Sequence, residues 1–115
     1  MSLKIHPREV DGVMILDLTG RITTGEPSVT VRDAVRKEID KGFKNILLNM
    51  GEITYIDSAG LGELIAAYTT VKNRGGHLKL LNLTKRLHEL MQITKLYTVF
   101  DVRDDEAHAI ASFAK

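Results

Sequence analysis

The chain has 115 residues, enough for one domain with a single hydrophobic core and too few for two, so we expect one domain over residues 1–115. Its formal net charge is +1, with acids and bases interspersed, which argues against binding nucleic acid or an anionic membrane through a general electrostatic field. Without cysteine it can form neither a disulfide framework nor a thiolate metal site. It also has no apolar segment typical of a secretion signal or of a membrane-spanning helix, so we expect a cytoplasmic protein.

Two strands joined by a tight turn are predicted first. Residues 4–8 and 13–19 flank Asp11 and Gly12, which are turn-forming residues, so the two strands are expected to form a hairpin. Alternation in the second strand gives it two faces, one with Met14, Leu16 and Leu18 and the other with Val13, Ile15 and Asp17. The residues that follow, 20–25, are expected to form a loop.

A helix and a buried strand are predicted next. Pro27 favours the first turn of a helix, and Gly42 is typical of its end. The inward face of this helix has apolar residues at helical spacing, namely Val31, Ala34, Val35 and Ile39. Residues 45–50 form a short apolar run, which is typical of a strand buried on both faces.

The second half of the chain continues this alternation of helices and strands. The expected elements are a helix from about Ser58 to Arg74, a strand from His77 to Asn82, a helix capped by Thr84, a strand from Val99 to Val102, and a helix capped by Asp104 or Asp105. The inward residues of the last two helices are expected to be Leu87, Leu90 and Met91, and then Ala107, Ile110, Ala111 and Ala114. The pattern predicts an α/β fold with a mixed, mostly parallel sheet of about five strands, an edge hairpin and about four helices. Functional loops are expected beyond the carboxyl ends of the strands, at residues 20–25 and 51–57.

The most informative stretch is residues 55–62, Tyr-Ile-Asp-Ser-Ala-Gly-Leu-Gly, at the junction of a strand and a helix. Asp57 and Ser58 are both favoured N-caps, so one of them is expected to begin the helix. Ser58 then lies where backbone N–H groups lack partners and the helix dipole is positive, which suits a phosphate or a carboxylate. Gly60 and Gly62 are poor helix formers, and we interpret them as leaving a surface without Cβ atoms that another backbone can approach closely. The alternative is that the serine is an ordinary helix cap.

The sequence does not support an enzymatic site. A hydrolase nucleophile elbow needs a glycine two residues before the serine, where this chain has Ile56. A dinucleotide-binding fingerprint that starts at Gly60 needs a glycine where the chain has Ile65. The four histidines have no metal-ligand spacing, and no Walker-type Gly-Lys-Ser or Gly-Lys-Thr sequence occurs. We therefore expect no catalytic residues, no metal site and no cofactor.

Residues 57–62, which follow Ile-Thr-Tyr-Ile, resemble the signature of STAS domains, and in particular of bacterial anti-sigma factor antagonists. The resemblance extends over nearly the whole chain. Residues 16–20 resemble the early strand of the family, 45–49 its central strand, 74–80 the turn into the next strand, and 87–100 its third helix and last strand. The resemblance implies a single STAS-like domain.

The resemblance also implies a partner-switching mechanism. In anti-sigma factor antagonists the serine that matches Ser58 is phosphorylated by a partner that is both anti-sigma factor and protein kinase. The unmodified antagonist binds that partner and releases the sigma factor, and phosphorylation dissociates the complex. ATP and Mg²⁺ then belong to the kinase, and a phosphatase restores the unphosphorylated form. The residues expected to contact the partner are Asp57, Ser58, Ala59, Gly60, Leu61, Gly62, Thr23 and Thr24.

Two departures from the family pattern bear on these expectations. Ala59 stands where relatives often have a second hydroxyl residue, so Ser58 is the single acceptor in this motif. Thr23 or Thr24 stands where relatives commonly have an acidic residue, in a loop that touches the kinase. The alternative function is that of a STAS scaffold, such as an accessory subunit of a transporter or of a signalling assembly, in which Ser58 is not phosphorylated.

Overall fold

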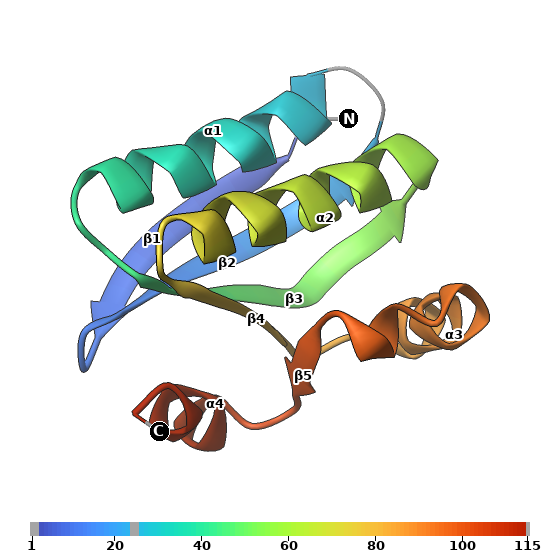
Figure 1. Cartoon of the computed structure of the whole chain (residues 1–115). Coiled ribbons are helices and arrows are strands. Elements are labelled where there is room, and N and C mark those ends of the chain that lie inside the picture. The colour runs from blue at the N-terminus through green and yellow to red at the C-terminus, as the bar shows by residue number, and fades with distance from the viewer. Residues whose placement is uncertain (1–2, 24–25, 115) are drawn as a thin grey trace.

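The computed structural model describes residues 3–23 and 26–114, with residues 26–30 described in their backbone alone. Two strands are followed by helices and strands in alternation (Figure 1). In chain order the elements are β1 (Lys4–Val10), β2 (Val13–Ile22), α1 (Glu26–Asp40), β3 (Asn45–Ile56), α2 (Ser58–Asn73), β4 (His77–Leu81), α3 (Lys85–Thr94), the 3₁₀ helix η1 (Leu96–Thr98), β5 (Asp101–Arg103) and α4 (Glu106–Ser112).

The first two strands form the predicted hairpin. Asp11 and Gly12 both have positive φ, 52° and 81°, as a two-residue type I′ turn requires. Val10 and Val13 pair directly on either side of this turn. Pro7 lies in β1 at the edge of the sheet, where a residue without an N–H group is acceptable.

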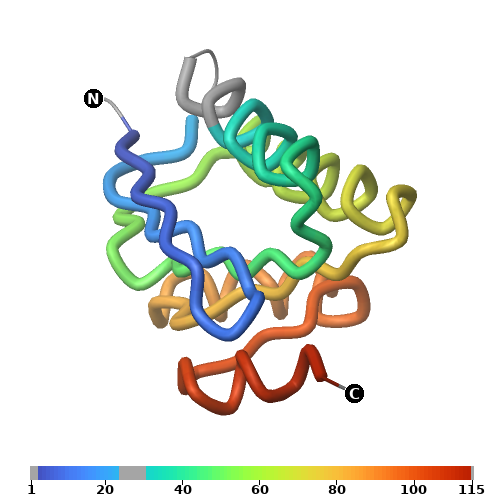
Figure 2. Tube along the Cα trace, turned by 90° about the vertical axis from the view of Figure 1, so that its left-hand side faces the viewer, coloured from blue at the N-terminus to red at the C-terminus, as the bar shows by residue number. Residues whose placement is uncertain are grey.

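The sheet has five strands in the order β1-β2-β3-β4-β5. β1 is antiparallel to β2, and the other pairs are parallel. Helices α1 and α2 lie side by side over one face of the sheet, and α4 lies against the other face (Figures 1 and 2). The expected α/β fold, with a mixed and mostly parallel sheet, is confirmed.

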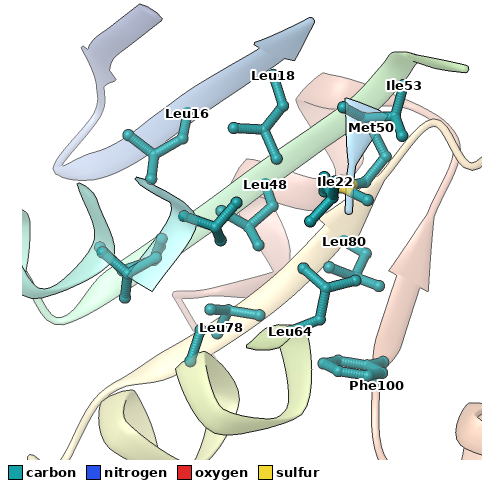
Figure 3. Close-up of a cluster of buried hydrophobic side chains, with 14 of the residues drawn as sticks. Leu16, Leu18, Ile22, Leu48, Met50, Ile53, Leu64, Leu78, Leu80 and Phe100 are labelled. Carbon is teal, nitrogen blue, oxygen red and sulfur yellow. The ribbon is translucent and has the colours of Figure 1, made fainter. Parts of the chain in front are cut away.

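Apolar side chains fill the space on both faces of the sheet. The larger cluster lies under α1 and α2 and includes Leu16, Leu48 and Leu64, all fully buried (Figure 3). Ile15 and Leu47 belong to a second cluster, with Ala109 of α4. Because neighbouring residues of β2 and β3 are buried on opposite faces, both strands have apolar residues on both faces, as the apolar run at residues 45–50 predicted for β3.

Charged side chains tie α4 to the sheet at both ends. Arg8 Nη2 lies 2.6 Å from Glu106 Oε1 at the start of the helix, and Arg8 Nε lies 2.6 Å from Asp17 Oδ2 on β2. At the other end, Lys79 Nζ donates to the Ser112 hydroxyl at 2.7 Å. The hydrogen bonds from Arg8 hold the pKa of Glu106 below its usual value. Burial alone raises the pKa of Asp17, but the hydrogen bonds that it accepts, first of all from Arg8, lower it on balance.

Strands β2 and β3 are longer than the sequence predicted. β2 continues to Ile22 and β3 to Ile56, so the loop expected at residues 51–57 is wrong for all but its last residue. The loop expected at residues 20–25 is wrong for its first three residues, while residues 24 and 25 lie outside the described part of the chain. The pairing passes Gly20, which has a φ of 120°, and has two register shifts. Such irregularities break the two-residue alternation by which a strand is predicted.

Smaller differences occur near the carboxyl terminus. β5 comprises Asp101–Arg103 instead of the expected 99–102. The expected Asp105 cap is confirmed, since its side chain accepts a hydrogen bond from His108 N at 2.9 Å. The helix buries Ala109, while the three alanines expected to face inward are exposed: Ala107, Ala111 and Ala114. A run of alanines has too little contrast with its neighbours to show which side of the helix faces the sheet.

Candidate functional site

The candidate site is the junction between β3 and α2, and residues 57–62 are called the serine turn below (Figure 1). Asp57 has an extended backbone, and its Oδ1 accepts a hydrogen bond from Gly60 N at 2.8 Å. Asp57 is therefore the N-cap, and Ser58 is the first residue of α2, as near to the helix start as the sequence predicted. Ser58 is exposed, and its hydroxyl forms no hydrogen bond within the described part of the chain.

The two glycines of the serine turn have different surroundings. Gly60 is buried, and a Cβ at this position would lie 2.2 Å from Ile22 O. The same carbonyl accepts a hydrogen bond from Asp57 N at 3.2 Å, so the turn is fastened to the end of β2. Gly62 is exposed, and a Cβ there would meet no atom within 4 Å. The interpretation that both glycines open the backbone to a partner is wrong for Gly60, which serves internal packing, and stays a prediction for Gly62.

The other predicted contact residues have mixed positions. Thr23 directly follows the strand end to which Asp57 is hydrogen-bonded, so it lies beside the serine turn. Ala59 and Leu61 are half-buried, and Leu61 packs against the core. Thr24 lies outside the described residues. The structure thus brings Thr23 and the serine turn together at one corner of the domain.

Two arginines far from the serine turn in sequence lie on the elements beside it. Arg32 of α1 donates from Nε to Glu63 Oε1 at 2.8 Å, and from Nη2 to Oε2, so it ties α1 to α2. These hydrogen bonds hold the pKa of Glu63 below its ordinary value. The guanidinium of Arg21 lies over the Tyr55 ring, 5.1 Å from the ring centroid. Neither pair was predicted from the sequence, because local patterns do not show which distant residues meet.

A shallow groove of about 250 Å³ lies between the end of β3 and α3, and we call it the β3–α3 groove. Its lining is mostly apolar and comprises Tyr55, Ile56, Arg86, Leu87, Glu89, Leu90 and Ile93. Ile93 is 80% exposed and Tyr55 is 38% exposed. This groove was not predicted from the sequence. Its one signal was Ile93, an isoleucine outside the predicted inward face of its helix.

Other kinds of site find little support in residues 3–23 and 26–114. Within them no three His, Cys, Asp or Glu side chains lie close enough together to hold a metal ion. His77 is exposed at the start of β4, and His88 stacks on Tyr97 with the ring centroids 6.0 Å apart. A bilayer-spanning helix would have to be longer and more apolar than any described here. The serine turn and the β3–α3 groove are therefore the candidate functional features.

Relatives of nearly the same length are known in bacteria. The anti-sigma F factor antagonist of Paenibacillus polymyxa is 24% identical over 115 residues, a match that covers 96% of this chain and 94% of the relative. The anti-sigma-B factor antagonist of Bacillus subtilis is 28% identical over 102 residues, covering 89% of this chain and 92% of the relative. This chain is thus homologous to bacterial anti-sigma factor antagonists over almost its full length.

Solved structures have the same fold. An anti-sigma factor antagonist from Mycobacterium paratuberculosis superposes with a TM-score of 0.84 at 16% identity, covering 99% of this chain and 96% of that one. The Bacillus cell fate determinant SpoIIAA in its phosphorylated form gives 0.72 at 19% identity, covering 95% and 98%. The sequence itself matches the STAS domain over residues 4–109. Because this match includes both candidate features and nearly every element of the fold, the chain belongs to the STAS domain family.

Proposed function

We propose that this STAS protein is an anti-sigma factor antagonist that works by partner switching. In its unphosphorylated state it binds an anti-sigma factor with serine kinase activity and frees the sigma factor, and phosphorylation of Ser58 ends this binding. The proposal is carried by the position of Ser58, an exposed hydroxyl on the first residue of α2. Similarity over most of the chain to two anti-sigma factor antagonists supports it.

The start of α2 suits a phosphate. A phosphoserine carries about −1.5 to −2 charge at pH 7, and an anion at a helix N-terminus is stabilised by the dipole and by the free N–H groups. Because Asp57 supplies the cap, modification of the Ser58 hydroxyl removes no capping hydrogen bond. We therefore expect the phosphorylated domain to stay folded.

The same phosphate opposes binding of a partner. Asp57 already has a carboxylate at this corner, so phosphorylation of Ser58 places two anionic groups on adjacent residues. A partner packed closely against the exposed backbone at Gly62 would have to desolvate both groups. Loss of binding without loss of the fold is the expected result.

In this mechanism the protein is the substrate of phosphorylation and has no catalytic role. ATP and Mg²⁺ belong to the partner kinase, and a phosphatase restores the unphosphorylated serine. We place the exchange in the cytoplasm, with no direct contact to nucleic acid or membrane. The partner contacts proposed here are Asp57, Ser58, Ala59, Leu61, Gly62, Thr23 and Thr24, and Gly60 supports them from inside the domain.

The test is incubation of the protein with Mg·ATP and the small ATPase-like kinase encoded nearest to its gene, followed by mass spectrometry of peptides. We expect one phosphate on Ser58, and none on the Ser58→Ala variant, which should bind the kinase constitutively. Phosphate on Thr54 or Thr69 would contradict the proposal. Both of these hydroxyls donate to backbone carbonyls, at 3.2 Å to Gly20 O and 3.0 Å to Ile65 O. An unmodified Ser58, together with a permease gene beside this one, would favour the scaffold function.

A further inference from the structure

Two exposed apolar side chains meet at the β3–α3 groove, and one of them, Tyr55, is three residues before Ser58. In the described part of the chain four such residues are exposed: Tyr55, Ile65, Ile93 and Tyr97. Two of them, Tyr55 and Ile93, line opposite sides of the β3–α3 groove. Apolar surface that is gathered around a groove, instead of being scattered singly, is typical of a site that binds another molecule.

We propose that the β3–α3 groove binds an apolar anchor side chain of the same anti-sigma kinase that phosphorylates Ser58, an inference that rests on the function proposed above. Tyr55 is three residues before Ser58, so at about 3.3 Å per residue their Cα atoms lie within about 10 Å of each other. An interface of ordinary size covers about 800 Å² on each partner, which is a patch of roughly 16 Å radius. A kinase seated on Ser58 therefore covers the near wall of the groove as well.

The rim of the groove suits a partner with polar groups around an apolar anchor. Arg86 and Glu89 form no ion pair and no side-chain hydrogen bond within the described part of the chain. The guanidinium of Arg21 stacks on Tyr55 at the β3 wall. By contrast, Arg32 is already committed to Glu63. The groove thus has an apolar floor and an uncommitted charged rim, which is the usual anatomy of a protein interface.

Ile93 allows the groove to be tested without harm to the fold. Its side chain is 80% exposed, so the folded domain gains little from its burial. Gln92 is its exposed neighbour on α3 and does not line the groove. Ile93→Asp and Gln92→Asp therefore make the same change of charge on the same helix, one inside the groove and one outside it. Ile93→Ser removes the apolar surface without adding a charge.

The experiment is calorimetric titration of each variant with the kinase encoded nearest to its gene, in the presence of Mg·ATP. All variants are made in a Ser58→Ala background, which prevents turnover, and thermal melts are recorded for each. We expect Ile93→Asp and Ile93→Ser to raise Kd at least about tenfold, because the anchor of the kinase loses an apolar wall of the groove that holds it. Gln92→Asp should stay within about twofold of its parent, and all melting temperatures should agree closely. In the native Ser58 background, Ile93→Ser should lower kcat/KM for phosphorylation while the phosphate still enters Ser58.

Three results would overturn the inference. If the parent binds the kinase and the Ile93 variants bind as Gln92→Asp does, the groove is not part of the contact, although the proposed function stands. If the Ser58→Ala parent does not bind the kinase and the native protein accepts no phosphate from it, the proposed function fails and the groove proposal fails with it. If sedimentation reveals a dimer of the isolated domain that Ile93→Ser abolishes and Gln92→Asp keeps, the occupant of the groove is a second copy of this chain.

Discussion

Alanine at Gly60 and alanine at Gly62 should change the stability of the domain in opposite directions. At Gly60 the new Cβ would lie 2.2 Å from Ile22 O, 2.8 Å from its Cγ2 and 2.9 Å from its carbonyl carbon. The carbonyl has little freedom to move, because Ile22 pairs with Ile56 across the sheet and its oxygen accepts the Asp57 N–H. The helix or the strand must shift instead. At Gly62 no atom lies within 4 Å of the new Cβ.

The expected magnitudes follow from these contacts. Overpacking typically costs about 1–3 kcal/mol, and the clash at Gly60 is with backbone, which favours the upper end of that range. Alanine favours the helix over glycine by up to about 1 kcal/mol, which offsets part of this cost. The free energy of unfolding of Gly60→Ala should therefore be about 2 kcal/mol lower than that of the wild type. The free energy of unfolding of Gly62→Ala should rise by about 0.4–1 kcal/mol, because alanine favours the helix and its Cβ causes no clash there. For a domain of this size, 1 kcal/mol corresponds to roughly 4 °C in Tm.

Urea unfolding followed by circular dichroism measures both changes on the same scale. The Gly60→Ala midpoint should fall, and the Gly62→Ala midpoint should rise. A Gly60→Ala variant as stable as the wild type would refute the close contact between α2 and the end of β2. A destabilised Gly62→Ala variant would refute the open space at that position. Either result would remove the distinction between an internal and an external glycine.

Four further predictions concern the cap, the switch and the tie of α4. Asp57→Ala should cost about 0.5–2 kcal/mol of unfolding free energy and Ser58→Ala clearly less; equal losses in urea unfolding would contradict the assignment of the cap. Ser58→Asp should melt near the wild-type temperature and bind the kinase more weakly, since an acid suits the helix start and not the interface; wild-type affinity by calorimetry would refute this. Gly62→Val should also weaken that binding, with Ser58 unmodified, because a branched side chain blocks close approach; unchanged affinity would show that this backbone is not a contact. The pKa of Glu106 is lower in the folded domain than in the unfolded chain, where it is about 4.3. The ionised carboxylate therefore stabilises the fold above that pH, and this stabilisation is lost as the pH falls through the pKa of the folded state. Glu106→Gln should therefore lower stability at pH 7, and its difference from the wild type should shrink below about pH 4.3; a constant difference across that range would show that the ion pair with Arg8 is not its cause.

Much of the fold could be predicted because its signals are local. Asp11 and Gly12 mark the hairpin, and the apolar run at 45–50 marks a strand buried on both faces. The last parts of β2 and β3 were missed because their pairing depends on register shifts near Gly20, which only the partner strand reveals. Tertiary contacts, more than sequence periodicity, decide where such strands end.

The candidate site was predicted in position and only partly in detail. The start of α2 at Ser58 follows from adjacent cap residues and the apolar helix face, both of which are local. Two features depend on distant residues and could not be read locally. Gly60 is enclosed by Ile22, and the β3–α3 groove joins Tyr55 to Ile93 across two elements. A glycine required for internal packing and one that leaves open surface look the same in a single sequence.

In the proposed mechanism, the serine turn assigns folding and regulation to different residues. Asp57 caps α2 through Gly60 N, and Gly60 packs against the end of β2, so the contacts of these two residues hold the turn in place in the folded domain. Ser58 and Gly62 are exposed and make no comparable internal contact in the described part of the chain. A charge added at Ser58 therefore acts on the surface that a partner would cover, while the contacts that hold the helix in place are unchanged. For this reason the free energies of binding and of unfolding should respond to different substitutions only a few residues apart, and a phosphate can act as a switch without first loosening the fold.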